Sequence, residues 1–396
     1  MLTKKSIPVL LVTVIVTLML SSGSIAETMV QESPLPSPTG EWYDICPDDA
    51  DCVYTPQPTY TPEPTYTPEP IPTCSPTRVC STPTALPTGT PYPTSTPYPL
   101  QPGFQAQVIR GIWIQNTMNS NTARERVEAA AQLGANTVYV FVGSGSRTTF
   151  LNSQGIPSTD TLSATIQAAQ KHGIRVYAAI PVKYFTRSGY GEQNLNGRYP
   201  GISENWLDFR NPAARKLIAD LAVDIAQQYN VAGIVLDYIR YSRFWYPSSG
   251  LTPDDITSCV CETHDALAGT GVQLEASTIS IYRDNTYGAL DAYGQAWVDW
   301  LDRECIDRIQ PMTYLDLSRL KARLAEWVAT GHYPERITPI LSPIRWDSDP
   351  NPKTASDWRS EIRFIRQSTD HLNVFDERHL GRHPLLADVL VKEWQP

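Results

Sequence analysis

The sequence predicts an α/β protein in which eight parallel strands alternate with helices and close into a (β/α)8 TIM barrel over residues 104–396. Three observations predict this fold. Short apolar runs alternate with helix-like segments along the whole region, as in parallel sheets with helical crossovers. The region has about the usual length of one such barrel, near 250 residues plus insertions. Gly134 and Gly173 directly follow helix-like segments, where glycine is a good stop signal.

Each strand is expected in a short apolar run and each helix in the segment that follows it. The expected strands are 108–114, 137–142, 174–182, 233–238, 272–281, 306–312, 337–341 and 371–375, of which the last has the weakest pattern. The expected helices are 122–133, 161–172, 212–229, 254–268, 293–303, 317–330, 358–367 and 384–394. Eight alternations favour a closed barrel over an open sheet.

The residues before the barrel predict an exported protein. Residues 1–26 have the parts of a secretory signal peptide: a basic start at Lys4 and Lys5, an apolar segment, and a small-residue cleavage site at Ala26. The apolar segment is shorter than the roughly 20 residues of a membrane-spanning helix, so we expect no stable membrane insertion after cleavage; a retained anchor is the alternative. Residues 27–103 are rich in Pro and Thr, and we expect them to form a disordered linker, because proline favours extended chain over a packed core. The expected location is secreted or associated with the cell envelope.

The cysteines suit an oxidising compartment. Those in the linker form two pairs of identical spacing, Cys46 with Cys52 and Cys74 with Cys80. We expect two small disulfide loops there, with a zinc site as the alternative. In the barrel region, either Cys259 or Cys261 could bridge to Cys305 and leave one thiol over.

The most informative segment runs from Ala232 to Tyr241, where an apolar strand ends abruptly in Asp237. In a parallel barrel, an ionisable group at the carboxyl end of a strand projects into the ligand crevice. Asp237 is therefore the predicted primary catalytic carboxylate. The alternative is an aspartate that only caps the following loop.

Other strand ends supply the acids and aromatic rings that a sugar site requires, because carboxylates act on the glycosidic bond and rings stack on sugars. The predicted partner acids are Asp284 and Asp316, with Asp347 third. The predicted substrate-binding residues are Lys183, Arg240, Tyr241, Tyr314, Trp346 and Asp347. Loop packing and surface ion pairing are the plain alternatives for each of them. The six histidines include no ligand-spaced pair at the strand ends, so neither a metal nor a cofactor is predicted.

Five segments of the region resemble the glycoside hydrolase barrels of bacterial exported proteins, that is, the family-ten-like glycosyl hydrolases and related barrels of unassigned function. They are Arg110–Trp113, Ala178–Lys183, Trp206–Pro212, Tyr229–Tyr241 and Gln310–Tyr314. The resemblance implies a TIM barrel outside the cytoplasm that acts on a polysaccharide or on peptidoglycan glycan strands. Met312-Thr313-Tyr314 is also similar to a chitinase-like motif, but Ile239 stands where chitinases carry the acid glutamate, so substrate-assisted chemistry is not expected.

Together these observations predict a secreted glycoside hydrolase that uses paired carboxylates. The alternative is a non-catalytic glycan-binding barrel displayed at the cell envelope, and a lyase or deacetylase is a third possibility. The formal net charge of -9 argues against nucleic acid as a partner, since binding to phosphates needs a basic surface.

Overall fold

The structure is a computed structural model that describes residues 108–115, 119–144, 147–182, 207–241, 250–284, 287–345 and 352–395. The predicted signal peptide, the Pro/Thr-rich linker and its four cysteines lie outside these residues. No helix in the described ranges is both long enough and apolar enough to cross a membrane.

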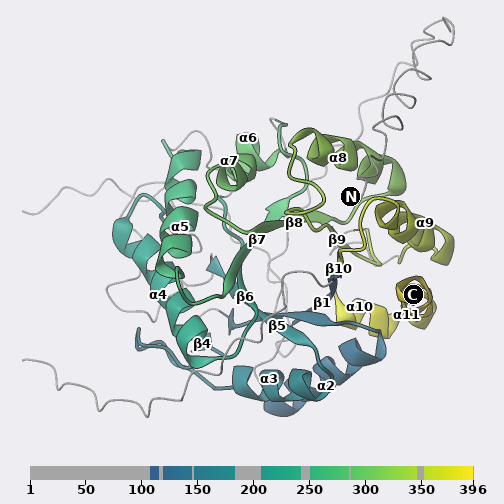
Figure 1. Cartoon of the computed structure of the whole chain (residues 1–396), viewed down its shortest axis with the longest axis horizontal. Coiled ribbons are helices and arrows are strands. Elements are labelled where there is room, and N and C mark those ends of the chain that lie inside the picture. Colours follow the sequence, from purple (N-terminus) through teal and green to yellow (C-terminus); the bar gives the residue numbers. More distant parts are fainter. Residues whose placement is uncertain are drawn as a thin grey trace, which may run out of the picture. The chain divides into compact units, whose positions relative to one another are not determined.

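Eight parallel strands close into a barrel in the order β1-β10-β9-β8-β7-β6-β5-β2 (Figure 1). The barrel strands are β1 Arg110–Ile114, β2 Thr137–Phe141, β5 Arg175–Pro181, β6 Gly233–Asp237, β7 Gln273–Ile279, β8 Arg308–Thr313, β9 Ile340–Leu341 and β10 Leu372–Val374. Each lies within one of the eight predicted runs or extends it by one residue. The predicted closed parallel barrel is therefore confirmed, including its weak eighth strand.

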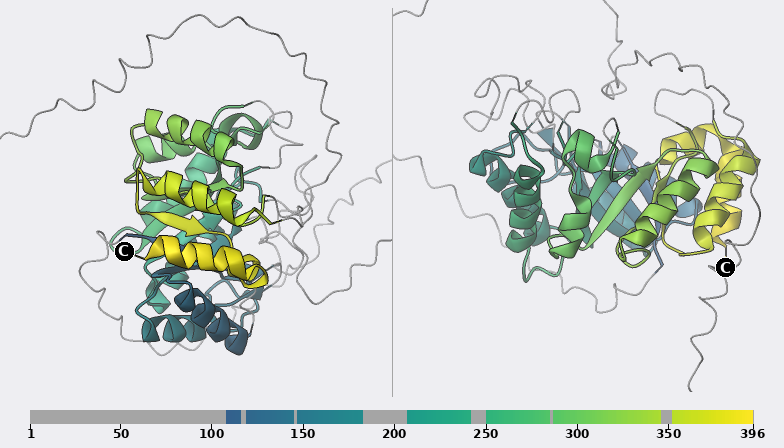
Figure 2. Two further views of the ribbon diagram at one scale, coloured as in Figure 1. Left: turned by 90° about the vertical axis from the view of Figure 1, so that its right-hand side faces the viewer. Right: turned by 90° about the horizontal axis from the view of Figure 1, so that it is seen from above.

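Helices surround the barrel on its outer side (Figures 1 and 2). They are α2 Ser120–Gln132, α3 Leu162–Lys171, α4 Pro212–Gln228, α5 Pro253–Ala266, α6 Ala289–Tyr293, α7 Trp297–Asp302, α8 Leu317–Ala329, α9 Ala355–Arg366, α10 Glu377–Arg382 and α11 Pro384–Trp394. A short antiparallel pair, β3 Gly143–Ser144 and β4 Arg147–Thr148, follows β2.

Strand side chains alternate between the helices and the barrel interior, as the period of two requires. In β6, Ile234 and Leu236 belong to the large apolar cluster that also contains buried side chains of the surrounding helices. Val235 belongs to a separate cluster in the barrel interior. Gly233 also faces inward, because a Cβ there would lie 2.3 Å from a ring carbon of Tyr177. The bulky rings inside the barrel thus require glycine at this strand position.

Two helical predictions need correction. A single helix was expected over 293–303, but the chain forms α6 and α7 instead, because Gly294 has a φ of 72° and ends α6. The side chain of Gln295 in the break accepts a hydrogen bond from the N–H of Ile279 at 2.9 Å and donates to the carbonyl of Ile239 at 3.1 Å. The second correction is α10, which directly follows the eighth strand and was not predicted.

The disulfide of the barrel is one of the two predicted pairings. Cys261 of α5 forms a disulfide with Cys305, and Cys259 remains a free, buried thiol. Burial raises the pKa of Cys259 to about 12, so this thiol is protonated at neutral pH and unsuited to nucleophilic chemistry.

Candidate active site

The carboxyl end of β6 places Asp237 at the mouth of the barrel. Val235 faces the interior, so Asp237, two residues later, faces inward as well, and the residue as a whole is only 6% exposed. Tyr238 follows in the left-handed region with a φ of 53°, which turns the chain immediately after the carboxylate. Non-glycine residues in this region are uncommon and concentrate at functional sites. The local backbone thus presents Asp237 where active sites of this fold lie.

Aromatic rings line the interior at the same end of the barrel. Trp113 of β1 lies 5.3 Å from Phe141 and 6.4 Å from Phe375, measured between ring centroids. Phe375 in turn stacks on Tyr314 at 5.4 Å with an interplanar angle of 26°. We call these four residues the aromatic platform. Phe141 and Tyr314 are partly exposed, so part of the platform is accessible at the mouth.

A polar chain of contacts crosses from β10 to β1 beside the platform. Asp376, which is fully buried, accepts a hydrogen bond from the backbone N–H of His379 at 3.0 Å and lies 3.4 Å from the guanidinium of Arg378. Arg378 also donates to the side-chain oxygen of Gln115, the residue after β1. The amide nitrogen of Gln115 must then point the other way, and it has no partner in the described part of the chain. This nitrogen is therefore a buried, unsatisfied hydrogen-bond donor beside the platform.

Glu377 lies next to this chain of polar contacts, but its side chain points to the surrounding helices. It forms an ion pair with Arg126 of α2. Burial, followed by repulsion from Asp376, raises the pKa of Glu377 to about 8. A protonated carboxyl near neutral pH is what a general acid needs, but the partner from α2 indicates a role in attaching α10 to the barrel.

The two predicted partner acids are exposed and bind local backbone. Asp284 lies in the connection after β7, where its carboxylate accepts a hydrogen bond from the N–H of Tyr287 at 2.8 Å. Asp316 is the N-cap of α8 and accepts from the N–H of Arg319 at 3.0 Å. That hydrogen bond is the main reason why the pKa of Asp316 is lowered. Neither carboxylate is buried in the mouth as Asp237 is.

Three of the six predicted binding residues lie in the described part of the chain, each in different surroundings. Tyr314 belongs to the aromatic platform. The guanidinium of Arg240 lies 5.0 Å from the ring centroid of Tyr293 and 5.3 Å from that of Tyr238, so it packs on rings at the turn after β6. Tyr241 is buried in the outer apolar cluster against Phe209, and burial raises its pKa.

Lys183, Trp346 and Asp347 lie outside the described residues, so their placement stays a prediction. Within the described residues, no group of three or more His, Cys, Asp or Glu side chains is arranged to hold a metal ion.

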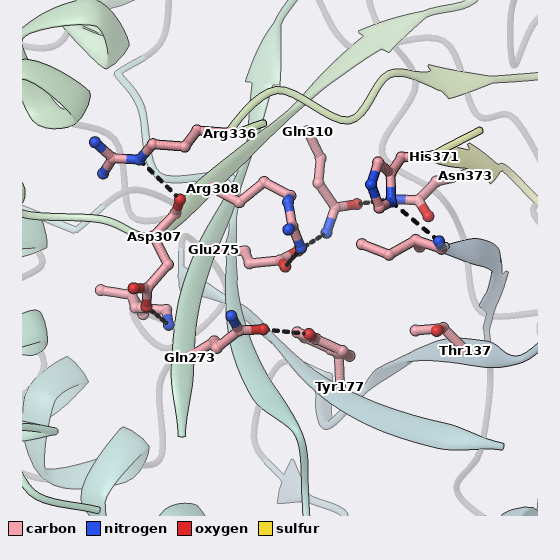
Figure 3. A network of polar contacts seen from close by, with 12 residues as sticks. Thr137, Tyr177, Gln273, Glu275, Asp307, Arg308, Gln310, Arg336, His371 and Asn373 are labelled. Atoms are coloured by element: carbon pink, nitrogen blue, oxygen red, sulfur yellow. Dashed lines mark hydrogen bonds and ion pairs between the residues drawn. The ribbon is translucent and has the colours of Figure 1, made fainter. Parts of the chain in front are cut away.

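The barrel interior farther from the mouth contains a different polar network (Figure 3). Glu275 of β7 is fully buried and accepts a hydrogen bond from Arg308 at 3.0 Å and another from Gln310. Gln310 accepts in turn from Asn373 of β10 at 2.9 Å. Burial raises the pKa of Glu275. These residues occupy the first half of their strands, where polar contacts in this fold serve stability.

The sequence interpretation placed Gln115 at the end of the first strand on the expected active face, but it missed Trp113, Phe141 and Phe375 of the platform, as well as Arg378. Strand parity could have found the platform. In its own strand, each of Trp113 and Phe141 lies two residues from a neighbour that faces inward. Because strand side chains alternate with a period of two, both rings are expected to face inward as well. The contact between Gln115 and Arg378 joins residues 263 apart in sequence and carries no local signal.

No protein-family model matches the chain, and no curated protein is similar to it in sequence. Among solved structures, the chain is similar to the glycoside hydrolase domain of PgaB (BpsB) from Bordetella bronchiseptica, with a TM-score of 0.57 and 14% identity over 73% of this chain and 99% of that one. It is also similar to the endo-1,4-beta-mannanase from Rhizomucor miehei, with a TM-score of 0.52 and 12% identity over 72% of this chain and 95% of that one. At these identities the similarity establishes the fold, a closed (β/α)8 barrel.

Proposed function

We propose that this protein is a glycoside hydrolase that cleaves glycosidic bonds in a polysaccharide or cell-wall glycan, with Asp237 as its primary catalytic carboxylate. The observation that carries the proposal is the inward-facing, nearly buried position of Asp237 at the end of β6. Its strand neighbour Val235 packs in the same interior cluster as Trp113 and Phe375. A carboxylate and ring faces at one barrel mouth are what a sugar site needs.

In a retaining reaction, Asp237 attacks the anomeric carbon while a second acid protonates the leaving oxygen, and water then hydrolyses the glycosyl-enzyme ester. The second acid stands about 5–5.5 Å from the nucleophile in retaining enzymes and about 6.5–9.5 Å in inverting ones. Asp284, Asp316 and Asp347 are the predicted partners. We add Asp376, because it is fully buried at the end of β10 and close to Arg378.

Two further observations support the proposal. Two of the solved structures with the same fold are named as a glycoside hydrolase domain and a mannanase. The Cys261–Cys305 disulfide suits an oxidising compartment, as expected for a secreted or envelope-associated protein.

A non-catalytic glycan-binding barrel is the second candidate. The observation that favours it is the exposure of Asp284 and Asp316. Their carboxylates already accept hydrogen bonds from backbone N–H groups of a turn and of a helix start. A barrel with the aromatic platform and a single mouth carboxylate would bind glycans without cleaving them.

The test is to incubate the full chain, as wild type and as Asp237→Asn, with peptidoglycan glycan strands and a panel of polysaccharides, and to measure new reducing ends. We expect release by the wild type and none by the variant. Release by both proteins would move the catalytic role to another acid. Glycan binding without release by either would establish the binding barrel. Anomeric NMR of the first product then assigns retention or inversion.

A further inference from the structure

A cavity lies on the same end of the barrel as Asp237, between the starts of α8 and α9, which are neighbours in Figure 1. Its volume is about 310 Å³. Its lining consists of charged and hydroxyl side chains with one leucine: Asp316, Leu317, Ser318, Arg345, Lys353, Asp357, Ser360 and Glu361. Such a volume is at the lower end of the range of small-molecule sites, about 300–1,000 Å³.

A buried ion pair makes one wall of the cavity rigid. Lys353 and Glu361 lie 2.6 Å apart, and each side chain is only 1% exposed. The ammonium of Lys353 also donates to the carbonyl of Leu315 at 2.9 Å, so it joins α9 to the connection between β8 and α8. The backbone N–H of Lys353 donates to the carbonyl of Pro343 at 2.9 Å, which fixes Lys353 close to the end of β9. The wall is therefore set before any ligand arrives, which lowers the entropic cost of binding.

The cavity lining also contains exposed charged side chains whose ion pairs are long. The guanidinium of Arg345 lies 3.9 Å from the carboxylate of Asp357, and one oxygen of Asp316 lies 3.8 Å from Arg319. Both separations exceed hydrogen-bond distance. All three lining side chains, Arg345, Asp357 and Asp316, are about half exposed. Arg345 and Asp357 can therefore bind a ligand without first breaking a hydrogen bond between themselves, whereas one oxygen of Asp316 already accepts hydrogen bonds from Ser318 and from the backbone of Arg319.

The mixture of charges selects the class of ligand. Lys353 and Glu361 neutralise each other. Of the exposed charges, Asp316 and Asp357 disfavour a phosphate or carboxylate, while Arg345 disfavours a metal cation or an amine. A neutral polyhydroxylated ring suits both kinds of side chain, because each hydroxyl donates to a carboxylate and accepts from a guanidinium.

We propose that this cavity is an additional glycan-binding subsite that holds a neutral sugar unit of the substrate away from the scissile bond. The class of ligand rests on the proposed function, and the site deepens it: long glycans would contact both the mouth and the α8–α9 cavity, and short ones only the mouth.

The test measures binding of a graded series of neutral oligosaccharides, from disaccharide upwards, to the full chain by titration calorimetry. All proteins carry Asp237→Asn, so that no sugar is cleaved. Asp357→Asn and Arg345→Ala remove cavity contacts. Asp370→Asn is the matched control, since Asp370 pairs with Arg366 at 3.4 Å, is 58% exposed against 50% for Asp357, and does not line the cavity.

We expect Asp357→Asn and Arg345→Ala each to raise the Kd of the long oligosaccharides about tenfold, which corresponds to about 1.4 kcal/mol. The Kd of the shortest ligand that binds, and every Kd of Asp370→Asn, should stay unchanged. Equal affinities in Asp357→Asn and Asp370→Asn at every length, or no binding at any length, would overturn the subsite. Asp357-dependent binding of calcium chloride without sugar binding would overturn it too.

Hydrolysis by the protein with Asp237 intact separates the two proposals. Cleavage without any dependence of binding on Asp357 would leave the glycoside hydrolase standing and remove the subsite. Length-dependent binding that needs Asp357, without cleavage, would establish the subsite on a binding barrel.

Discussion

Removal of the Cys261–Cys305 disulfide should lower the stability of the barrel by an amount that follows from the chain length it encloses. The two cysteines are 44 residues apart. Cross-linking a loop of that length reduces the entropy of the unfolded chain by an amount equivalent to about 4 kcal/mol at 25 °C. Both cysteines are half-buried, so replacement by serine leaves little cavity cost to add. The loop contains β7 and α7, so the bridge restrains a substantial part of the barrel wall.

The assay is thermal unfolding of the full chain, as wild type and as the double variant Cys261→Ser/Cys305→Ser, followed by circular dichroism. At about 2–4 °C per kcal/mol for large domains, the Tm should fall by roughly 8–16 °C. Because other cysteines of the chain also respond to reductant, the control is dithiothreitol added to both proteins: the wild type should approach the variant, and the variant should not move. A fall of less than about 2 °C in the double variant would refute the reasoning.

Three further predictions concern the barrel interior, the β10 end and the platform. Gly233→Ala places a Cβ 2.3 Å from the Tyr177 ring and should destabilise the fold by about 1–3 kcal/mol or more. Gly381→Ala, whose Cβ would have nothing within 4 Å, is the control and should not destabilise it. Urea unfolding of both variants tests this prediction. Because the pKa of Glu377 is raised to about 8 in the folded state, the folded chain retains a proton that the unfolded chain has lost between about pH 4.5 and 8. Stability should therefore fall with rising pH in that window, and Glu377→Gln should reduce the slope of Tm against pH; equal slopes would contradict the assignment. Tyr314→Ala should weaken glycan binding about tenfold or more in calorimetry through loss of stacking, and an unchanged Kd would remove Tyr314 from the site.

The strands were predictable because a parallel barrel buries both faces of each strand, so each appears as an apolar run. Even β10, with only Leu372–Val374, could be located from this pattern. The helix expected over 293–303 could not be divided correctly, because the break depends on Gly294 and on contacts of Gln295 with distant backbone. Tertiary contacts of this kind leave no periodic signal.

The direction of a side chain at the candidate site was predictable only where the residue belongs to a strand. Asp237 is the last residue of β6, so its direction follows from the alternation of the strand. Asp284 and Asp316 lie beyond the strand ends, where no alternation applies. Asp316 directly precedes a helix and is followed by Ser318 and Arg319, a pattern that also suits an N-cap, and the structure places it there. A count of acids near strand ends therefore predicts the region of the mouth but not which acids face it.

The most direct test of the central claim is single-turnover hydrolysis by wild type and Asp237→Asn on the glycan that the wild type cleaves best, with Kd measured for the same glycan. If Asp237 is the catalytic carboxylate at the barrel mouth, the variant should lose at least about 10²-fold in the rate of bond cleavage and bind the glycan with unchanged Kd. A cleavage rate close to that of the wild type, at equal saturation, would contradict the account and assign the chemistry to another acid.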